Sequence, residues 1–275
     1  MIYECNQVLE LIESNSCVLF DIRDDFDYLE EHIPGAVSAP DIFFYLSEST
    51  PEGIKRLQSF FVELFGKSGL SKDKTAIIYE YSLDSRYGGS CRGYWLLDYL
   101  GHDKVGILNG GFRLWKKSGC PVSKIPVVPE QSVFIPKINE SIFAAKFDVI
   151  SAINNPDIVI LDSRDEIEWI GESSSPYGID FAPRKGKIPG AKWIEWCSFM
   201  NSPGEYPTFL KKEEIVTLCA KHDIYPESDI ILYCFKGARA SNTYLALKYA
   251  GFKKIRLYFA GWNEWSRDFS LPIKK

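Results

Sequence analysis

One cysteine stands among neighbours that could make its sulfur reactive. Cys234 directly follows the apolar run 230–233 and opens the sequence Cys-Phe-Lys-Gly-Ala-Arg, which ends at Arg239. A segment with helical periodicity, 241–250, comes next. The N-terminus of a helix offers unpaired N–H groups and a partial positive charge, and both favour a thiolate over a thiol. We therefore expect Cys234 to be a nucleophile held at the start of a helix.

The other residues of this loop have types that suit an anion. Two of them are cations, and a central glycine lets the backbone curl so that amides can face the sulfur. The remaining cysteines of the chain lack such neighbours, and a lone cysteine is mostly a core residue. The loop therefore predicts a thiolate or persulfide that reacts with an anionic partner. The expected substrate-binding residues of the loop are Phe235, Lys236, Gly237, Ala238 and Arg239.

The composition narrows the class of protein. With 275 residues, 45% of them hydrophobic, the chain can form one large or two medium-sized domains, each with a core. The net charge is -5 and the charges are interspersed, which argues against nucleic acid as a partner. No export signal and no long apolar span is evident, so we expect a cytoplasmic protein without a membrane partner. The spacing of Cys and His residues favours reduced thiols over disulfides or a metal site.

Several short phrases occur twice in the same order. Apolar runs that end in Asp-x-Arg are paired with Ile-Pro-Gly-Ala, a second apolar run and a Gly-aromatic phrase. The paired positions are 18–23 and 159–164, 33–36 and 188–191, 75–79 and 229–233, and 110–115 and 260–265. So long a period indicates a duplicated domain rather than a solenoid.

Each copy alternates short apolar runs with segments of helical period, which favours an α/β fold with a parallel sheet covered by helices. In the second copy we expect strands over 158–161, 230–233 and 254–259. We expect a helix over 241–250, with Gly251 as its left-handed cap.

A proline-bearing stretch around residues 123–131 separates the two copies. The predicted division is a first domain over 1–125, a linker over 126–140 and a second domain over 141–275.

The two copies differ where the chemistry would occur. The first copy has Glu80 in the place of Cys234, and its connection to the next helix is longer. The second copy alone has a polar insertion, from Gly171 to Arg184, ahead of Ile-Pro-Gly-Ala. We therefore expect the first copy to support the reaction rather than to perform it.

On these residues the chain resembles the tandem form of the rhodanese, or thiosulfate/3-mercaptopyruvate sulfurtransferase, family. The resemblance rests on the loop 234–241, both Ile-Pro-Gly-Ala and both Asp-x-Arg phrases, and the closing Gly-Trp-Asn-Glu-Trp at 261–265. It covers essentially the whole chain. It implies two similar rhodanese-like domains, each a five-stranded parallel sheet flanked by helices, with only the C-terminal one catalytic.

The resemblance also implies a double displacement. The Cys234 thiolate would take the outer sulfur of thiosulfate, release sulfite and pass its persulfide sulfur to cyanide or a thiol. Lys236 and Arg239 would stabilise the departing anion. No cofactor is required. The expected partners are a small anionic sulfur donor and a thiophilic acceptor, either a small thiol or a protein.

Further residues are assigned by the resemblance or by position. A basic residue in the insertion of family members tends to face the substrate, which makes Arg184 a candidate; the alternative is a solvated loop charge. Asp162 and Ser241 are expected as supporting residues, with Asp162 orienting a loop cation. Arg164 and Glu168 have the spacing of a structural i, i+4 pair.

The chain departs from the family pattern at two positions. Lys187 stands where many relatives have His, and Glu168 stands where some animal enzymes have a second Arg. These departures predict a differently arranged substrate pocket with unchanged sulfur chemistry.

Three alternatives remain at this point. A 3-mercaptopyruvate sulfurtransferase typically has small neutral residues in the loop, whereas cations favour a dianion such as thiosulfate. A cysteine phosphatase uses Cys-x5-Arg, while this loop is Cys-x4-Arg and suits a sulfur atom better than a phosphoryl group. A non-catalytic binding module fits the first copy better than the second.

Overall fold

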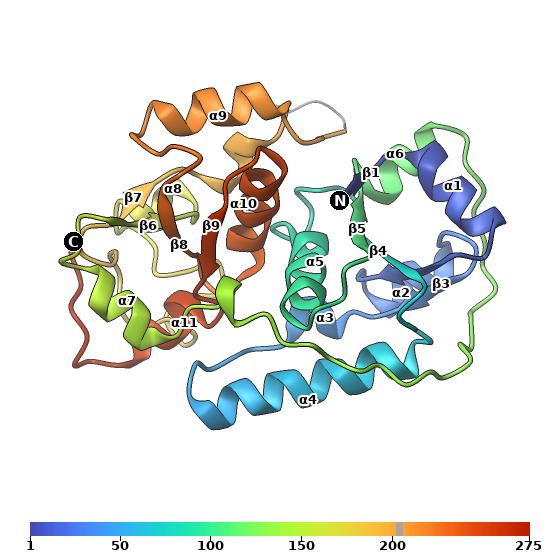
Figure 1. Ribbon diagram of the computed structural model, residues 1–275, viewed down its shortest axis with the longest axis horizontal. Helices are drawn as coiled ribbons and strands as arrows, with labels where there is room; N and C mark the ends of the chain where they lie inside the picture. The colour runs from blue at the N-terminus through green and yellow to red at the C-terminus, as the bar shows by residue number, and fades with distance from the viewer. Residues whose placement is uncertain (202–205) are drawn as a thin grey trace. The chain divides into compact units, whose positions relative to one another are not determined.

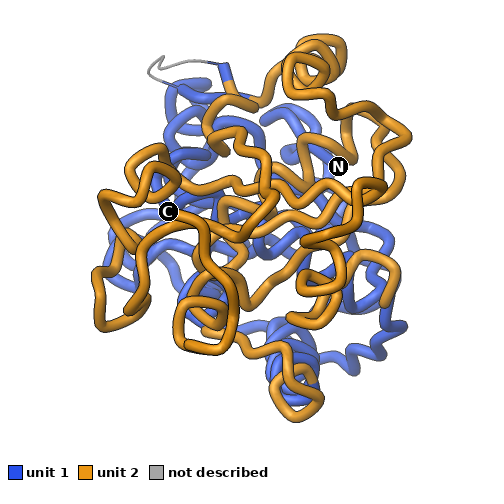
Figure 2. The backbone as a smooth tube through the Cα atoms, turned by 90° about the vertical axis from the view of Figure 1, so that its left-hand side faces the viewer, with its two compact units in different colours: residues 1–45, 55–139, 201–208 blue, residues 46–54, 140–200, 209–275 orange. Residues whose placement is uncertain are grey.

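In the computed structural model, which describes residues 1–201 and 206–275, the chain divides into two compact units (Figure 2). Unit 1 comprises residues 1–45, 55–139 and 201–208. Unit 2 comprises residues 46–54, 140–200 and 209–275. Each unit therefore includes a short segment from the other half of the chain.

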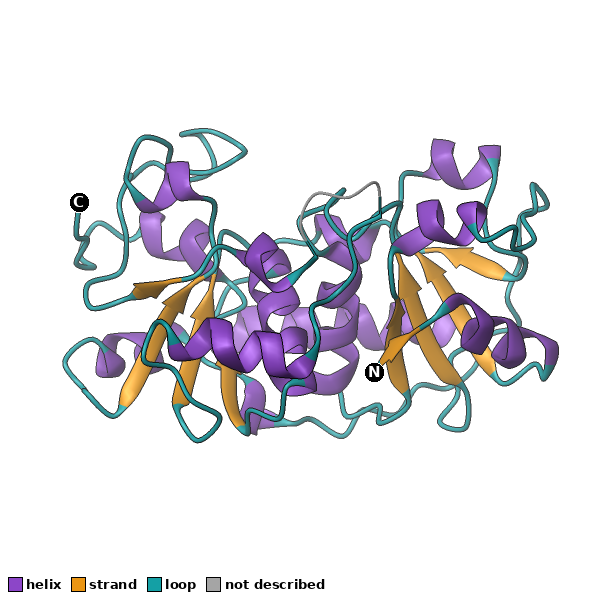
Figure 3. Cartoon of the chain, turned by 90° about the horizontal axis from the view of Figure 1, so that it is seen from above, coloured by secondary structure: helices purple, strands orange, loops and turns teal. Residues whose placement is uncertain are grey.

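Unit 1 is a parallel sheet flanked by helices (Figures 1 and 3). Its strand order is β1-β5-β4-β2-β3, and each neighbouring pair is parallel. The strands are β1 (Ile2–Tyr3), β2 (Cys17–Asp21), β3 (Ala36–Ser38), β4 (Thr75–Tyr79) and β5 (Val105–Leu108). The helices are α1 (Cys5–Glu13), α2 (Asp25–Glu30), α3 (Asp41–Phe44), α4 (Pro51–Lys67), α5 (Gly89–Tyr99) and α6 (Gly111–Lys117), of which α4 begins in the segment that belongs to unit 2.

Unit 2 repeats this design with the strand order β7-β6-β8-β9. The strands are β6 (Ile158–Asp162), β7 (Lys192–Trp193), β8 (Asp229–Tyr233) and β9 (Lys254–Leu257). The helices are η1 (Glu140–Ile142), α7 (Lys146–Ala152), α8 (Glu166–Trp169), η2 (Trp196–Phe199), α9 (Lys212–Ala220), α10 (Ala238–Tyr249) and α11 (Gly261–Arg267).

The expected five-stranded sheet is wrong for unit 2, whose described residues form a sheet of four strands. The counterpart of β1 is reduced to an isolated parallel bridge between Phe143 and Leu257. The Ala144 amide donates to the Leu257 carbonyl at 3.1 Å, and α7 begins at Lys146, directly after this bridge.

The strands and the helix expected in the second copy are present, with changed bounds. The strand expected over 254–259 ends at Leu257, and the helix expected to begin at Ser241 begins at Ala238. Gly237 precedes this helix with φ +91°, and Gly251 follows it with φ +95°, as a left-handed cap requires. Arg239 therefore lies in the first turn of α10.

The stretch expected as a linker packs along unit 1. The Ser132 amide donates to the Gly66 carbonyl at 2.9 Å, and the Lys137 amide donates to the Leu100 carbonyl at 2.8 Å. The buried ring of Phe134 contacts unit 1 between these two bonds. The segment up to Asn139 thus belongs to the packed structure of unit 1.

The Asp-x-Arg phrase of unit 2 builds a buried polar network at the end of β6. The Arg164 guanidinium donates to both oxygens of Asp162, at 3.0 and 2.7 Å. The Tyr233 hydroxyl donates to Asp162 at 2.5 Å and accepts the Ile188 amide at 3.3 Å. The network therefore joins the ends of β6 and β8 to the Ile-Pro-Gly-Ala phrase.

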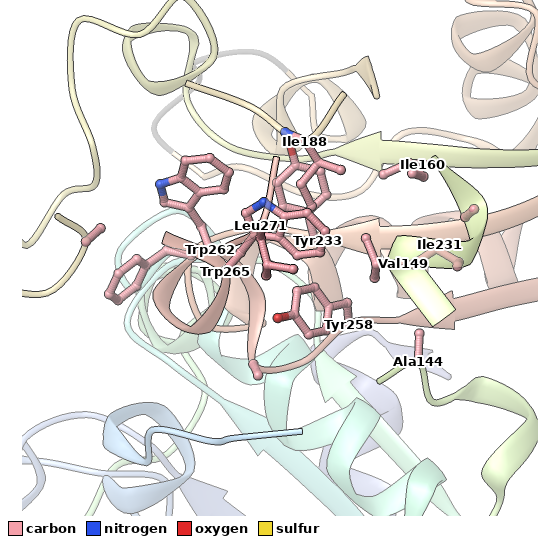
Figure 4. Close-up of a cluster of buried hydrophobic side chains, with 14 residues drawn as sticks. Ala144, Val149, Ile160, Ile188, Ile231, Tyr233, Tyr258, Trp262, Trp265 and Leu271 are labelled. Atoms are coloured by element: carbon pink, nitrogen blue, oxygen red, sulfur yellow. Dashed lines mark hydrogen bonds between the residues drawn. The ribbon is translucent and has the colours of Figure 1, made fainter. Parts of the chain in front are cut away.

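Aromatic side chains enclose this network. The Arg164 guanidinium lies 4.4 Å from the ring centroid of Trp262. Figure 4 shows Tyr233, Trp262 and Trp265 within the same hydrophobic cluster as Ile160 and Ile188. Removing water from an ion pair in this way makes each partner depend on the other.

Unit 1 contains the same network. Arg23 donates to Asp21 at 2.6 Å, the Tyr79 hydroxyl donates to Asp21 at 2.7 Å, and the Ile33 amide donates to Tyr79 at 3.2 Å. The repeated phrases of the sequence are thus the buried framework that each unit needs at the carboxyl edge of its sheet.

This framework gives a first prediction. Asp162→Ala should lower the free energy of unfolding by about 3–5 kcal/mol, because it leaves the buried Arg164 guanidinium without its carboxylate. The matched control is Asp229→Ala, which removes an aspartate from the partly exposed pair with Arg256 and should cost less than about 1 kcal/mol. Urea unfolding measures both variants, and equal losses would contradict the assignment.

Candidate active site

Cys234 lies at the junction between β8 and α10. The Gly237 amide donates to Cys234 Sγ at 3.2 Å, the one amide contact that the described residues provide to this sulfur. The side chain is buried, with 1% of the residue exposed. The sulfur therefore lies within the turn that begins α10, where the positive end of the helix dipole favours negative charge.

Helix α11 supports this turn through backbone hydrogen bonds. The amides of Trp262 and Asn263 donate to the carbonyls of Cys234 and Phe235 at 2.8 and 3.0 Å. The first amides of a helix have no partner within the helix, so they are available for such a bond. Gly261 has φ +60°, and a Cβ atom there would overlap the Cys234 carbonyl and lie 2.7 Å from that of Phe235. Only glycine lets α11 approach the turn so closely.

The loop arginine is paired within unit 2. The Arg239 guanidinium donates to both oxygens of Glu168, to Oε1 at 3.1 Å, and lies 3.0 Å from Asp165 Oδ2. Burial raises the pKa of Glu168, although Arg239 acts to lower it. Arg239 also lies close enough to Cys234 for their charges to interact. A buried guanidinium with two carboxylates thus stands beside the sulfur.

The expected pair between Arg164 and Glu168 is therefore wrong. Arg164 folds back onto Asp162, two residues before it, and Glu168 pairs mainly with Arg239 from α10. Asp162 is occupied by this bond and by Tyr233, and it orients no loop cation among the described residues. Spacing along a helix shows which side chains share a face, but not which partner from another element arrives there.

The insertion of the second copy packs on the loop. Tyr177, within this insertion, has its ring centroid 4.9 Å from that of Phe235, and Lys236 Nζ lies 5.1 Å from the Tyr177 centroid. The side chain of Phe235 belongs to the buried hydrophobic cluster. Phe235 thus contributes packing and a backbone carbonyl to the site, while Lys236 places a cation next to an aromatic ring.

Arg184, expected to face the substrate, binds backbone carbonyls at the end of α11. Its guanidinium donates to the carbonyls of Trp265, Ser266 and Leu271 at 2.6–2.8 Å. The last carbonyls of a helix have no partner within the helix, and they attract a cation. Arg184 therefore binds the C-terminal end of α11, and its contact with substrate stays a prediction.

The remaining loop residues lie in the first turn of α10. Ala238 is buried, and the Ser241 amide donates to the Gly237 carbonyl at 2.9 Å. The Ser241 hydroxyl is buried and finds no hydrogen-bond partner among the described residues. Both residues thus help to begin the helix beneath the turn.

A carboxylate that the sequence did not single out supports α11. Glu264 accepts the amide and the hydroxyl of Ser49 at 2.8 and 2.6 Å, and the Tyr258 hydroxyl at 2.6 Å. Ser49 belongs to the segment that joins unit 2 from the first half of the chain. This partnership spans most of the sequence, so no local pattern could indicate it.

Unit 1 contains the same turn without a thiol. The Phe112 and Arg113 amides donate to the Glu80 and Tyr81 carbonyls at 2.9 and 2.8 Å, as the first amides of α11 do in unit 2. Gly111, with φ +67°, precedes them. The loop therefore keeps its backbone support although its first residue is Glu80.

The Glu80 carboxylate fills the turn that it opens. Its oxygens accept the Ser90 amide at 3.0 Å, the Ser90 hydroxyl at 2.7 Å and the Arg86 amide at 3.1 Å. Burial raises the pKa of Glu80 to about 7, against these hydrogen bonds, which act to lower it. A built-in carboxyl group thus occupies the place of the sulfur.

Comparison with known proteins agrees with the duplicated design. The model of the rhodanese-like domain matches residues 4–118 and 148–268. The chain belongs to the rhodanese-like family. The described residues contain no helix that is long and apolar enough to cross a membrane, and no group of three or more His, Cys, Asp or Glu side chains placed to hold a metal ion.

Relatives within this family cover most of the chain. The thiosulfate sulfurtransferase of Rattus norvegicus is 30% identical over 88% of this chain and 79% of its own length. The sulfur carrier protein TtuD of Thermus thermophilus is 29% identical over 98% of this chain and 94% of its own. A solved structure, the anaerobic ergothioneine biosynthesis enzyme from Chlorobium limicola in complex with trimethyl histidine, has a TM-score of 0.84 at 24% identity. It covers 100% of this chain and 70% of that one, and it shows the shared fold.

The close approach of α11 gives a second prediction. Gly261→Ala should destabilise unit 2 by roughly 3 kcal/mol, because the new methyl group meets two carbonyls and the backbone is left-handed. Gly251→Ala is the control: it also has a positive φ but nothing within 4 Å of the new atom, so it should cost about 1 kcal/mol. Thermal unfolding measures the loss, and hydrogen exchange should quicken at the Trp262 and Asn263 amides only in Gly261→Ala.

The buried Glu80 gives a third prediction, on pH. Because its pKa rises from 4.5 to about 7 on folding, the protonated form is favoured in the fold. This contribution to stability, roughly 3 kcal/mol, is present below pH 4.5 and is lost as the pH rises to about 7. Glu80→Gln, neutral throughout, should lack this loss. The unfolding free energies of both proteins, measured between pH 4.5 and 8, test this prediction. The same pH dependence in the two proteins would contradict it.

Proposed function

We propose that the protein is a sulfurtransferase that carries a sulfane sulfur as a persulfide on Cys234. The observation that supports this most is the position of the sulfur in the turn that begins α10, with the Gly237 amide donating to it and the Arg239 guanidinium nearby. Between the two donors that the family resemblance suggests, thiosulfate and 3-mercaptopyruvate, we favour thiosulfate. The acceptor would be a thiophile such as cyanide or a thiol.

The reaction would proceed in two displacements. The Cys234 thiolate attacks the outer sulfur of thiosulfate, the S–S bond of the donor breaks, and sulfite leaves with the bonding pair. In the second step a thiolate or cyanide attacks the outer sulfur of the persulfide, and the Cys234 thiolate is released. The Gly237 amide and the loop cations offset the negative charge that collects at the sulfur and at the leaving group.

The relatives support this assignment at the level of the reaction class. One of them bears the name thiosulfate sulfurtransferase and another the name sulfur carrier protein. Both names refer to a sulfur atom held and passed on, which is what a single cysteine in a positively polarised turn can do. For unit 1 we propose a supporting role, since Glu80 occupies the position of the thiol.

The alternatives differ in measurable ways. A 3-mercaptopyruvate sulfurtransferase would turn over mercaptopyruvate far faster than thiosulfate. A cysteine phosphatase would hydrolyse an aryl phosphate, which requires a cradle large enough for a phosphoryl group, whereas the turn here begins its helix four residues after the cysteine. Rates with these compounds, compared with thiosulfate, separate the three activities.

The mass of the intact protein gives the fourth prediction. After incubation with thiosulfate the chain should gain one sulfur of ~32 Da on Cys234, and addition of cyanide should remove it. Cys234→Ser should abolish this gain and lower sulfur transfer at least about 10³-fold.

The exposed Cys197 provides the matched control. Burial of its sulfur and the neighbouring Glu195 raise its pKa to about 12, so it should remain a thiol at neutral pH. Cys197→Ser should therefore keep the mass gain and the activity. Sulfur still bound to Cys234→Ser, or activity near that of the unchanged protein, would show that Cys234 is not the carrier.

A further inference from the structure

The charge around the Cys234 turn is balanced within the protein. Arg239 lies close to the sulfur, and two carboxylates, Asp165 and Glu168, reach Arg239 from the segment that follows β6. The second loop cation, Lys236, follows Cys234 by two residues and contacts the Tyr177 ring. The guanidinium that the sequence suggests as a partner for a dianion thus already has two anionic partners. An incoming anion does not meet Arg239 as an uncompensated charge.

Glu168 is the more strongly held of the two carboxylates. Its side chain is 1% exposed, and both of its oxygens accept from Arg239. The Asp165 side chain is 30% exposed, and its other oxygen accepts the Trp196 indole N–H at 2.9 Å. Solvent screens a buried charge much less than an exposed one, so Glu168 has the larger effect on the potential at the sulfur.

Unit 1 contains a corresponding pair between a loop arginine and a carboxylate. Its loop arginine, Arg86, lies 2.6 Å from Asp24, which occupies the place of Asp165 in the repeated phrase. Among the described residues, it is in unit 2 that a second, buried carboxylate joins the arginine, and this turn carries the thiol. Glu168 therefore acts where sulfur chemistry would occur.

We propose that Glu168 determines the donor specificity of the Cys234 site: by keeping Arg239 paired, it favours singly charged persulfide donors over doubly charged thiosulfate. This inference rests on the proposed sulfur transfer and narrows its substrate class. Glu168 is a positioning residue, since it acts through Arg239. A buried carboxylate in the pocket repels a dianion more strongly than a monoanion, so it weakens the binding of a singly charged donor less.

The preferred step uses the same attack on sulfur. The Cys234 thiolate attacks the outer sulfur of a persulfide, R–S–S⁻, the S–S bond of the donor breaks, and the thiolate R–S⁻ leaves. Two single negative charges enter and two leave, and no oxidant or reductant is needed. With thiosulfate the leaving group is the sulfite dianion, which Arg239 would stabilise better without Glu168.

The fifth prediction compares two donors in one variant. Glu168→Gln keeps the shape of the side chain and removes its charge. It should raise kcat/KM for thiosulfate roughly five- to tenfold, mainly through a lower KM, and change kcat/KM for cysteine persulfide less than about twofold. Quenched samples analysed by intact mass give the rate of sulfur loading on Cys234 with each donor. The gain with thiosulfate should shrink as salt is added.

Two further variants make the test specific. Glu166→Gln removes the same charge from an exposed position of α8, and it should leave the ratio of the two rates within about twofold of the original. Asp165→Asn removes the partly exposed partner of Arg239 and should shift the ratio toward thiosulfate by a smaller factor than Glu168→Gln. Asp165→Asn also replaces Glu168→Gln as the test variant if circular dichroism shows that Glu168→Gln does not fold.

The outcomes separate this inference from the proposed function. If neither donor loads sulfur on Cys234 in the unchanged protein, sulfur transfer itself is wrong. If both donors load sulfur and Glu168→Gln changes both rates by the same factor, Glu168 has only a structural role and the inference is wrong. A shift in the ratio without loss of loading supports it.

Discussion

The bond between the start of α11 and the loop that contains Cys234 is the constraint on which the site depends. Two backbone amides of this helix bind the carbonyls of Cys234 and Phe235, and this contact is possible only because Gly261 lacks a side chain. The other end of the helix is held by Arg184, and its middle by Glu264. A turn fixed in this way keeps the sulfur in one position before any substrate arrives, which spares the cost of ordering it later.

The two units show one backbone frame used for two different acidic side chains. In both, a buried Asp-x-Arg network closes the carboxyl edge of the sheet and a glycine-led helix supports the turn after the central strand. In unit 2 that turn holds a thiol, whereas in unit 1 it holds the carboxyl group of Glu80. The duplication thus separates what the fold requires, the network and the supporting helix, from what the chemistry requires, the cysteine.

The sequence predicts best what is local. Cys234, the glycine that curls the turn and the following helix are close in sequence, so their types and order indicate the turn directly. The helix begins earlier than expected because Ala238 and Ala240 are good helix formers directly after Gly237. The fifth strand of unit 2 could not be excluded from sequence, since its counterpart in unit 1 has only two residues and leaves little pattern.

Contacts between distant segments were the part that the sequence could not provide. The basic type and the position of Arg184 suggest a substrate contact, but they do not indicate that carbonyls at and beyond the end of α11 bind its guanidinium. Glu168 has the right spacing for Arg164, but Arg239 arrives from another helix and takes it. In each case the binding partner belongs to another element, which residue spacing within one segment cannot indicate. These pairings also reduce the positive charge that the two arginines offer to a substrate.

The segment 46–54 belongs to unit 2 although it lies in the first half of the sequence. Ser49, in this segment, donates two hydrogen bonds to Glu264 of α11 and so completes the unit that carries the cysteine. Residues 140–275 alone therefore lack a part of the unit that carries the cysteine. A fragment that begins after residue 139 would separate α11 from these two hydrogen-bond donors.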